Sequence, residues 1–315
     1  MLQLINLSNY NETNKMFAQS PEHLTTFLKK HHLDGIEMMF CDTWNKNLHK
    51  IDIIKGTHLW FWNDWLDFWH GYFDILVEQY GSLEDVRQYY GTLDKNEWLQ
   101  ILADNLKTCK QTQPQYMVCH IANARLNEIY NRKFHYSAKE VIKSSCELIN
   151  TLTKDLPAET ELLFENLWWP GLTLLDKDDL AILFENVKHP NCGLMLDTGH
   201  LANTNLDLRS QEQAVEYIIS TIDKLGEYKK FIKGIHLHCS LTGEYVRQSM
   251  GKYKPSLYDA FIHVNKIDRH LPFHTVRVKE IIEFIKPKYL VHEFIVNSIA
   301  DLEDKISIQQ EALGL

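Results

Sequence analysis

Short apolar runs alternate along the whole chain with longer segments of helical periodicity, and this alternation constrains the fold more than any other feature. The runs that we interpret as strands cover residues 2–7, 34–40, 53–60, 115–121, 161–167, 192–197, 232–238 and 289–295. Nearly continuous apolar strands are typical of a parallel sheet that is covered on both faces. Eight strand–helix units therefore predict a closed (β/α)₈ barrel, the TIM barrel, rather than an open doubly wound sheet.

No linker, repeat or low-complexity tract divides the 315 residues, so we expect a single domain over residues 1–315. Helix start signals agree with the alternation: Pro21 follows Ser20, and Ser137 with Glu140 has the spacing of a capping box. Two connections are unusually long, residues 61–92 after the third predicted strand and residues 239–275 after the seventh. Both leave the C-terminal ends of strands, where the active sites of such barrels are built.

The overall charge argues against a surface that coats nucleic acid. The formal net charge is -9 and the isoelectric point is near 6.0. The six cysteines include no C-x-x-C pair, so neither a zinc ribbon nor a disulfide framework is indicated. The sequence shows no basic leader and no apolar segment long enough to cross a membrane. We therefore expect a cytoplasmic protein that acts on a small molecule and has no membrane contact.

Polar side chains stand at or near the C-terminal ends of six predicted strands. These residues are His58, His120, Glu165, Asp197, His236 and Glu293. Because the C-terminal ends of barrel strands meet at one mouth, we expect the six side chains to converge. Any single histidine of this kind could be an ordinary hydrogen-bonded core residue, but several buried carboxylates together need a cation. Imidazole combined with carboxylate suits Zn²⁺, Mn²⁺ or Fe²⁺.

Two further pairs add candidate ligands. Asp197 and His200 lie three residues apart in the segment DTGH, and Asp268 and His270 lie two apart in the segment DRH. The Asp-x-His spacing of the second pair allows both side chains to chelate one ion. The second pair lies within the long connection after the seventh predicted strand.

The segments FEN, LDTGH, GIHLH, DRH and HEF, in this order, resemble the xylose isomerase-like TIM-barrel superfamily, also called AP endonuclease family 2. The ligand set is most similar to that of endonuclease IV. The resemblance implies a first metal ion at His58, His120 and Glu165, a second at Glu165, Asp197, His236 and Glu293, and a third at His200, Asp268 and His270. It favours two or three zinc ions, with Mn²⁺ or Fe²⁺ as alternatives, and it makes Glu165 and Glu293 the expected catalytic residues.

The implied activity is phosphoester hydrolysis at a two- or three-metal site, on a small or sugar-containing substrate. The principal alternative is a sugar or sugar-phosphate isomerase or epimerase that uses one ion at Glu165, Asp197, His236 and Glu293. A further alternative is a metal-dependent sugar-binding barrel without turnover. The DNA-binding loops of endonuclease IV are not recognisable in this sequence, so we do not expect duplex DNA as a substrate.

Five residues near the predicted mouth are candidates for substrate contact: Glu37, Trp60, Trp168, His238 and Arg269. His238 lies on the same face of the predicted strand as His236, because side chains two residues apart point the same way. It therefore suits either a substrate contact or the support of a ligand. Glu37 has an equal alternative as a buried ion pair. The Trp-rich segment 60–73 has two interpretations, an aromatic lid over the substrate or a helical cap packed on the barrel, and we slightly favour the cap.

Overall fold

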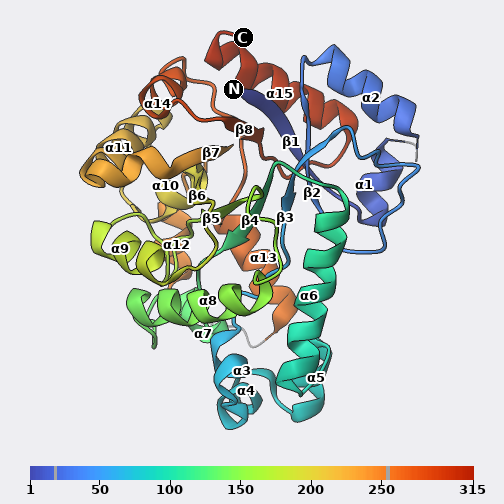
Figure 1. Ribbon diagram of the computed structural model, residues 1–315. Coiled ribbons are helices and arrows are strands. Elements are labelled where there is room, and N and C mark those ends of the chain that lie inside the picture. The colour runs from blue at the N-terminus through green and yellow to red at the C-terminus, as the bar shows by residue number, and fades with distance from the viewer. Residues whose placement is uncertain (18–19, 253–255) are drawn as a thin grey trace.

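The centre of the molecule is a closed barrel of parallel strands (Figure 1). The computed structural model describes residues 1–17, 20–252 and 256–315. Within these residues the strands pair in sequence order and β8 closes on β1. The strands are β1 (Leu2–Ser8), β2 (Gly35–Met39), β3 (Ile54–His58), β4 (Tyr116–His120), β5 (Glu161–Glu165), β6 (Cys192–Asp197), β7 (Ile232–Leu237) and β8 (Tyr289–His292). The predicted (β/α)₈ barrel is confirmed, and each predicted run overlaps one strand.

Helices surround the barrel (Figure 1). They include α1 (Asn11–Met16), α2 (Pro21–Lys30), α6 (Lys95–Gln111), α7 (Leu126–Asn131), α8 (Ala138–Leu152), α9 (Lys177–Asn186), α10 (Thr198–Asn203), α11 (Gln211–Lys224), the 3₁₀ helix η1 (Gly226–Phe231), α14 (Val278–Ile285) and α15 (Ile299–Leu313). Both predicted helix starts are present: the Ser20 hydroxyl caps α2, and Ser137 and Glu140 form the reciprocal capping box of α8. None of the described helices combines the length and the apolar character needed to span a bilayer.

The interior of the barrel changes from apolar to polar along the strand direction. A compact apolar cluster fills it below the mouth, made of Leu4, Tyr116, Val118, Leu163, Met195, Tyr289 and Val291. Because side chains two residues apart share a face, the next inward position on four of these strands is the polar residue at the mouth. These positions are His120, Glu165, Asp197 and Glu293. The packed layer therefore forms the floor on which the polar residues stand.

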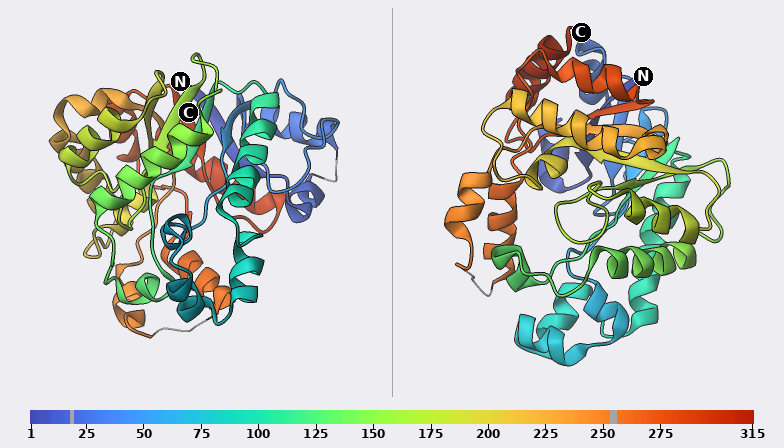
Figure 2. Two further views of the ribbon diagram at one scale, coloured as in Figure 1. Left: turned by 60° about the horizontal axis from the view of Figure 1, so that its bottom comes forward. Right: turned by 90° about the vertical axis from the view of Figure 1, so that its left-hand side faces the viewer.

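Both long connections fold into helices at the C-terminal side of the barrel. The first contains α3 (Leu66–His70), α4 (Phe73–Tyr80) and α5 (Leu83–Tyr90), and the second contains α12 (Gly243–Ser249) and α13 (Leu257–Ile267). Residues 253–255 of the second predicted connection lie outside the described residues. Figures 1 and 2 show α3, α4 and α5 projecting from the barrel on the side where α7 and α13 also lie.

The Trp-rich segment forms a small core of its own. Trp65, Phe68 and Trp69 are buried and pack with Tyr90 of α5 and Trp98 of α6. The Phe68 and Tyr90 rings stack with their centroids 4.3 Å apart. This packing agrees with the interpretation of the segment as a helical cap, because most of its aromatic side chains hold the inserted helices together.

Candidate metal centre

Glu165 lies at the centre of the polar mouth and is 1% exposed. Its Oε2 atom lies 3.1 Å from His58 Nε2, 3.2 Å from His120 Nε2 and 3.3 Å from His236 Nδ1. Its other oxygen lies 3.2 Å from His200 Nδ1. Strand pairing explains part of this geometry, because His120 on β4 is directly in register with Glu165 on β5. One carboxylate thus contacts imidazoles from three strands and from α10.

His236 joins Glu165 to Asp197, the last residue of β6, and to Glu293, which directly follows β8. Its Nδ1 atom lies 3.0 Å from Glu293 Oε2 and 3.3 Å from Glu165 Oε2. Despite these short distances, the Nδ1 atom makes no hydrogen bond with any of the described residues. Asp197 Oδ2 lies 4.0 Å from the same nitrogen. Asp197 also caps α10, because its Oδ1 atom accepts a hydrogen bond from the backbone of His200. Glu165, Asp197 and His236 form one of the groups whose ligand atoms lie within 4.8 Å of one another.

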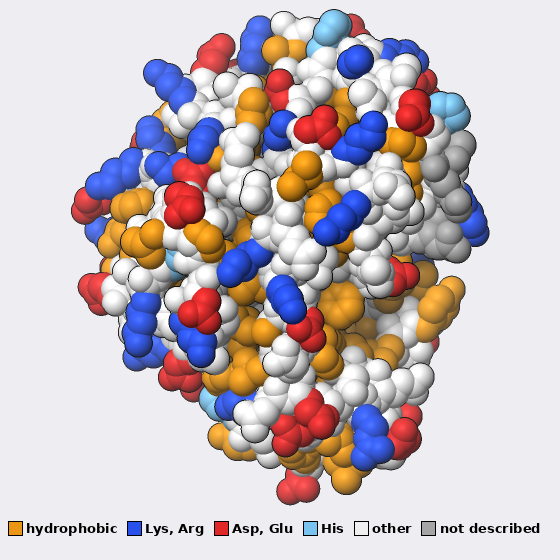
Figure 3. Space-filling model, turned by 45° about the vertical axis from the view of Figure 1, so that its right-hand side comes forward, with side chains coloured by type: hydrophobic (Ala, Val, Ile, Leu, Met, Phe, Trp, Pro, Cys, Tyr) orange, Lys and Arg blue, Asp and Glu red, His pale blue; other side chains and the backbone are white. Residues whose placement is uncertain are grey.

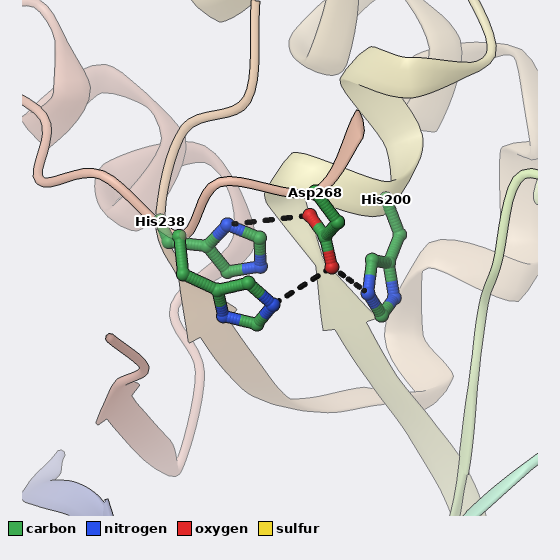
Figure 4. A group of neighbouring side chains, drawn as sticks. His200, His238 and Asp268 are labelled. Carbon is green, nitrogen blue, oxygen red and sulfur yellow. Dashed lines mark hydrogen bonds and ion pairs between the residues drawn. The ribbon is translucent and has the colours of Figure 1, made fainter. Parts of the chain in front are cut away.

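A third group converges on Asp268, at the end of α13. His270 Nε2 lies 2.7 Å and His200 Nε2 lies 2.9 Å from Asp268 Oδ2. Figure 4 shows His200 and His238 on opposite sides of the Asp268 carboxylate, and His238 Nδ1 lies 4.0 Å from Asp268 Oδ1. The four residues together are a candidate ligand group. The third site predicted from the sequence contains His200, Asp268 and His270 and does not include His238.

The charges within these groups compensate one another. Burial opposes ionisation of Glu165, but the charges of His120 and His236 outweigh it and hold the pKa of Glu165 well below its usual range. Burial likewise opposes ionisation of Asp268, whereas His270 and His200 lower its pKa. The pKa of His270 is raised to about 9, because Asp268 outweighs the cost of burial. Glu165 and Asp268 are therefore stabilised in their ionised form, and an ionised carboxylate favours a positively charged neighbour.

The donor set also fits divalent cations. Five buried polar atoms of the cluster have no hydrogen-bond partner within the described part of the chain: His120 Nδ1, His236 Nδ1, His238 Nδ1, His270 Nδ1 and Glu293 Oε2. Unpaired buried polar atoms are costly, and so many in one place need an explanation. Imidazole nitrogen and carboxylate oxygen are the ligands of Zn²⁺ and related ions. The mouth is therefore a candidate metal centre.

Neighbouring polar residues, which are not among the candidates from the sequence, fix the orientation of the candidate ligands. The Asn166 side chain exchanges two hydrogen bonds with the backbone of Asp197, and the Asn166 backbone carbonyl oxygen lies 2.9 Å from His200 Nδ1. The Ser240 hydroxyl donates to Asp268 Oδ1 at 3.0 Å. Their signals in the sequence are weak: Asn166 directly follows Glu165, and Ser240 lies two residues after His238.

A cavity of about 420 Å³ opens above the ligand cluster. His58, His120, His200, Asp268, His270 and Glu293 line its floor. Its walls come largely from the two long connections, with Tyr80 and Tyr89 on one side and Leu257, Phe261 and Val264 on the other. A cavity of this size suits a small ligand.

Of the two tryptophans predicted to contact the substrate, only one lines the cavity. Trp168 lines the cavity, and its ring centroid lies 5.0 Å from that of His200. Trp60 lies instead in a neighbouring apolar pocket with Trp62 and Trp98, and the described residues around the cavity do not include it. Phe61, the next residue in the chain, does line the cavity, and its ring centroid lies 3.8 Å from that of His120. Phe61 is not among the candidates from the sequence.

Two charged candidates also differ in their surroundings. The Arg269 side chain is exposed and is not among the described residues that line the cavity. Glu37 is 2% exposed and is held by His236 and by the Tyr116 hydroxyl, which donates to Glu37 Oε2 at 2.7 Å. This contact matches the buried ion pair that is the alternative for Glu37. Glu37 also lines a second cavity, of about 460 Å³, together with His58 and Glu293.

The fold and the donor set define a (β/α)₈ barrel with a candidate multi-metal centre at its C-terminal mouth. Residues 26–292 match the model of the xylose isomerase-like TIM barrel family, and the chain belongs to this family. The predicted family is thus confirmed. A search of curated proteins gave no match.

Several solved structures share the fold over nearly their whole length. A D-tagatose 3-epimerase-like protein has 15% identity and a TM-score of 0.55, over 100% of this chain and 97% of that one. Endonuclease IV from Thermus thermophilus has 12% identity and a TM-score of 0.56, over 100% and 99% of the two chains. The IolI protein, with a bound zinc atom, has 15% identity and a TM-score of 0.50, over 99% and 96%. At these identities the likeness shows the fold alone.

Proposed function

We propose that the protein hydrolyses a phosphoester of a small, sugar-containing molecule at a pair of divalent ions that share Glu165. The observation that carries this proposal is the position of Glu165, whose carboxylate lies within 3.3 Å of His58, His120, His236 and His200. A one-ion site needs only Glu165, Asp197, His236 and Glu293. His58 and His120 have no place in that smaller set.

The residues divide into two candidate sites that share Glu165. His58 and His120 would hold one ion with Glu165, and Asp197, His236 and Glu293 would hold the other with the same carboxylate. Divalent ions held in this way polarise a phosphoryl oxygen and stabilise the charge that develops during hydrolysis. We favour zinc because the set is rich in imidazole, with Mn²⁺ or Fe²⁺ as alternatives.

Glu293 is the carboxylate of the set that is most open to a substrate. Its side chain is 16% exposed, whereas those of Glu165 and Asp197 are at most 1% exposed. It lines both cavities at the mouth. Glu293 is therefore the carboxylate of the set that a bound substrate can reach directly.

The walls of the cavity support a small substrate. Trp168 and Phe61 line the cavity beside His200 and His120. Aromatic faces of this kind pack against the apolar face of a sugar ring or against a base. Leu257 and Phe261 of α13 extend the wall on the other side of the mouth.

The alternative is a sugar epimerase or isomerase that uses one ion. The fold shared with the D-tagatose 3-epimerase-like protein is consistent with this alternative. A third outcome is ligand binding without turnover. One experiment separates these functions. The purified protein, loaded with Zn²⁺ or with Mn²⁺, is assayed with p-nitrophenyl phosphate, with bis-p-nitrophenyl phosphate and with ketose sugars, and its metal content is measured.

We expect at least two ions per chain and phosphoester hydrolysis that is lost in Glu165→Gln. The matched control is Glu161→Gln, because Glu161 lies on the same strand at the opposite end of the barrel and contacts Lys288 and Tyr289. This control should keep both the metal content and the activity. One ion per chain with ketose epimerisation would replace the proposal by the alternative.

A further inference from the structure

Helix α13 turns a mainly apolar face to the cavity above the ligand cluster. The apolar side chains on this face have the spacing i, i+3, i+4 and i+7, and they are Leu257, Ala260, Phe261 and Val264. Leu257 is 42% exposed and Phe261 is 64% exposed, so much of both side chains is open to solvent. Exposed apolar side chains that gather at a cavity are typical of a surface that binds a ligand.

The wall on the other side of the cavity is apolar as well. Tyr80 of α4 and Tyr89 of α5 line it, with ring centroids 4.8 Å apart and an interplanar angle of 27°. Leu126 and Ile129 of α7 also line the cavity. A ring that enters the cavity therefore meets aromatic and aliphatic side chains from several helices, and aromatic side chains favour contact with another ring.

The cavity offers no Lys or Arg side chain to a second anionic group. Apart from the histidines of the candidate ligand groups, the described residues that line it are neutral or acidic. The second cavity at the mouth is alike, since none of its described lining residues is Lys or Arg. An anionic group that leaves water without a positive partner is costly to bury. The positive charge available to a substrate is therefore concentrated at the candidate metal centre.

Three basic residues are neighbours of lining residues in the chain, yet their side chains face elsewhere. Arg125 lies between two lining residues, but its Nε and Nη2 atoms each donate to the Asp67 carboxylate at 2.7 Å. Lys266 follows a lining residue, and its ammonium group lies 6.0 Å from the centroid of the Tyr245 ring. Arg269 also lies between two lining residues, and its side chain is exposed outside the described lining. The fold thus turns these cationic groups away from the cavity.

We propose that the substrate carries a single anionic group, bound at the candidate ions that share Glu165, and an uncharged apolar ring, bound between α13 and the helices α4 and α5. The inference rests on the proposed function and narrows its substrate. The phosphoester is the only anionic group, and compounds with a second phosphate or a carboxylate are poor ligands. Phe261 is a specificity-determining residue, because it is the most exposed of the described apolar side chains that line the cavity.

The first test uses phosphonates, which share the anionic head group of phosphoesters but resist hydrolysis. Calorimetry measures the binding of 1-naphthylmethylphosphonate, butylphosphonate and 4-phosphonobutyrate to the zinc-loaded protein. We expect the naphthyl compound to bind at least about 10-fold more tightly than butylphosphonate, because its rings bury more apolar surface. The terminal carboxylate of 4-phosphonobutyrate should weaken binding by at least about 10-fold relative to butylphosphonate. Equal affinities for the naphthyl and butyl compounds, or for the butyl compound and 4-phosphonobutyrate, would overturn the inference.

The second test compares Phe261→Arg with the matched control Tyr258→Arg. Both residues are exposed side chains of α13, at 64% and 73%, but of the two only Phe261 lines the cavity above the ligand cluster. Phe261→Arg should weaken the binding of 1-naphthylmethylphosphonate by about 3- to 10-fold, through the loss of a ring contact. It should strengthen the binding of 4-phosphonobutyrate by roughly 2- to 5-fold, because it supplies a cation near the carboxylate.

Tyr258→Arg adds the same charge to the same helix and should leave both affinities unchanged. Identical changes in the two variants would show a general effect of charge and would contradict the role of Phe261. Wild-type affinities in Phe261→Arg would contradict it as well.

The outcomes separate this inference from the proposed function. A protein that shows the expected order of phosphonate affinities but hydrolyses no phosphoester would retain the inference about the cavity and remove the hydrolase. A protein that hydrolyses p-nitrophenyl phosphate but binds 4-phosphonobutyrate as tightly as butylphosphonate would retain the hydrolase and remove the inference.

Discussion

The Oε1 atom of Glu37 lies 3.0 Å from the Nε2 atom of His236, whereas Glu165 and Glu293 face the other ring nitrogen, Nδ1. Glu37 belongs to β2 and His236 to β7, so the contact crosses the inside of the barrel. A carboxylate in this position fixes the tautomer and the orientation of a metal-binding imidazole and makes it a stronger ligand. Glu37 is thus a supporting residue of the candidate centre.

This relationship predicts the effect of Glu37→Gln. The substitution keeps the shape of the side chain and all candidate ligands but removes the charge behind His236. We expect the affinity for the ion at Glu165, Asp197, His236 and Glu293 to fall by about 10- to 100-fold, as is usual when an outer partner is lost. Calorimetric titration of the metal-free protein measures the change. Tyr116→Phe, which removes only the hydrogen bond to Glu37, should have a smaller effect.

Glu165→Gln should affect two ions together. Because Glu165 contacts both His58 and His236, the neutral amide weakens both sites that share it. Elemental analysis of the purified variant should show the loss of about two equivalents of metal relative to the wild type. The loss of a single equivalent, or of none, would contradict the assignment of Glu165 as a shared ligand.

The double substitution Asp268→Ala, His270→Ala should remove one ion and leave the barrel folded. Both residues lie between α13 and α14 and outside the strands, and neither belongs to the described apolar clusters of the barrel, so we expect the barrel to stay folded. We expect about one equivalent of metal less than in the wild type, with far-ultraviolet circular dichroism unchanged. Full metal content in this variant would show that the group around Asp268 does not bind an ion.

The sequence predicted the barrel and the convergence of the polar residues because both depend on local patterns. Apolar runs mark the strands, and the period of two brings His120, Glu165 and Glu293 to the mouth above Val118, Leu163 and Val291. The roles of these residues as ligands remain predictions. What the structure adds is that their donor atoms lie a few ångströms apart.

The sequence could not predict the details that depend on packing between distant segments. The stack of His238 on His270 joins the end of β7 to the DRH segment, and nothing in the spacing of these residues fixes their ring planes. Trp60 and Phe61 are adjacent, yet of the two only Phe61 lines the cavity at the mouth, whereas Trp60 lines the pocket beside Trp98. Residue type alone could not separate the two.

His49 should make the protein less stable in acid. It is 3% exposed, and burial lowers its pKa to about 4. The unfolded chain binds a proton at this residue near its ordinary pKa of about 6.5, so the folded state loses stability as the pH falls from about 6.5 to about 4.

The contribution of His49 amounts to about 2 kcal/mol between pH 7 and pH 4.5, from the difference between the two pKa values. Urea denaturation at both pH values, with metal removed, should show a loss of stability in the wild type that is smaller by this amount in His49→Leu. Equal pH dependence in the two proteins would show that His49 does not titrate with a lowered pKa.

Duplex DNA should bind only weakly. Affinity for the DNA backbone comes from Lys and Arg side chains that displace counterions, and this chain has 33 such residues against 42 acidic ones. On the face shown in Figure 3, basic side chains are interspersed with acidic ones. The helices of the two long connections also form walls of the cavity above the candidate metal centre, through residues such as Tyr80 and Phe261.

Fluorescence anisotropy with an abasic duplex at about 150 mM salt should give a dissociation constant weaker than about 1 µM. Submicromolar binding accompanied by cleavage of the abasic strand would show instead that the protein is a DNA-repair nuclease.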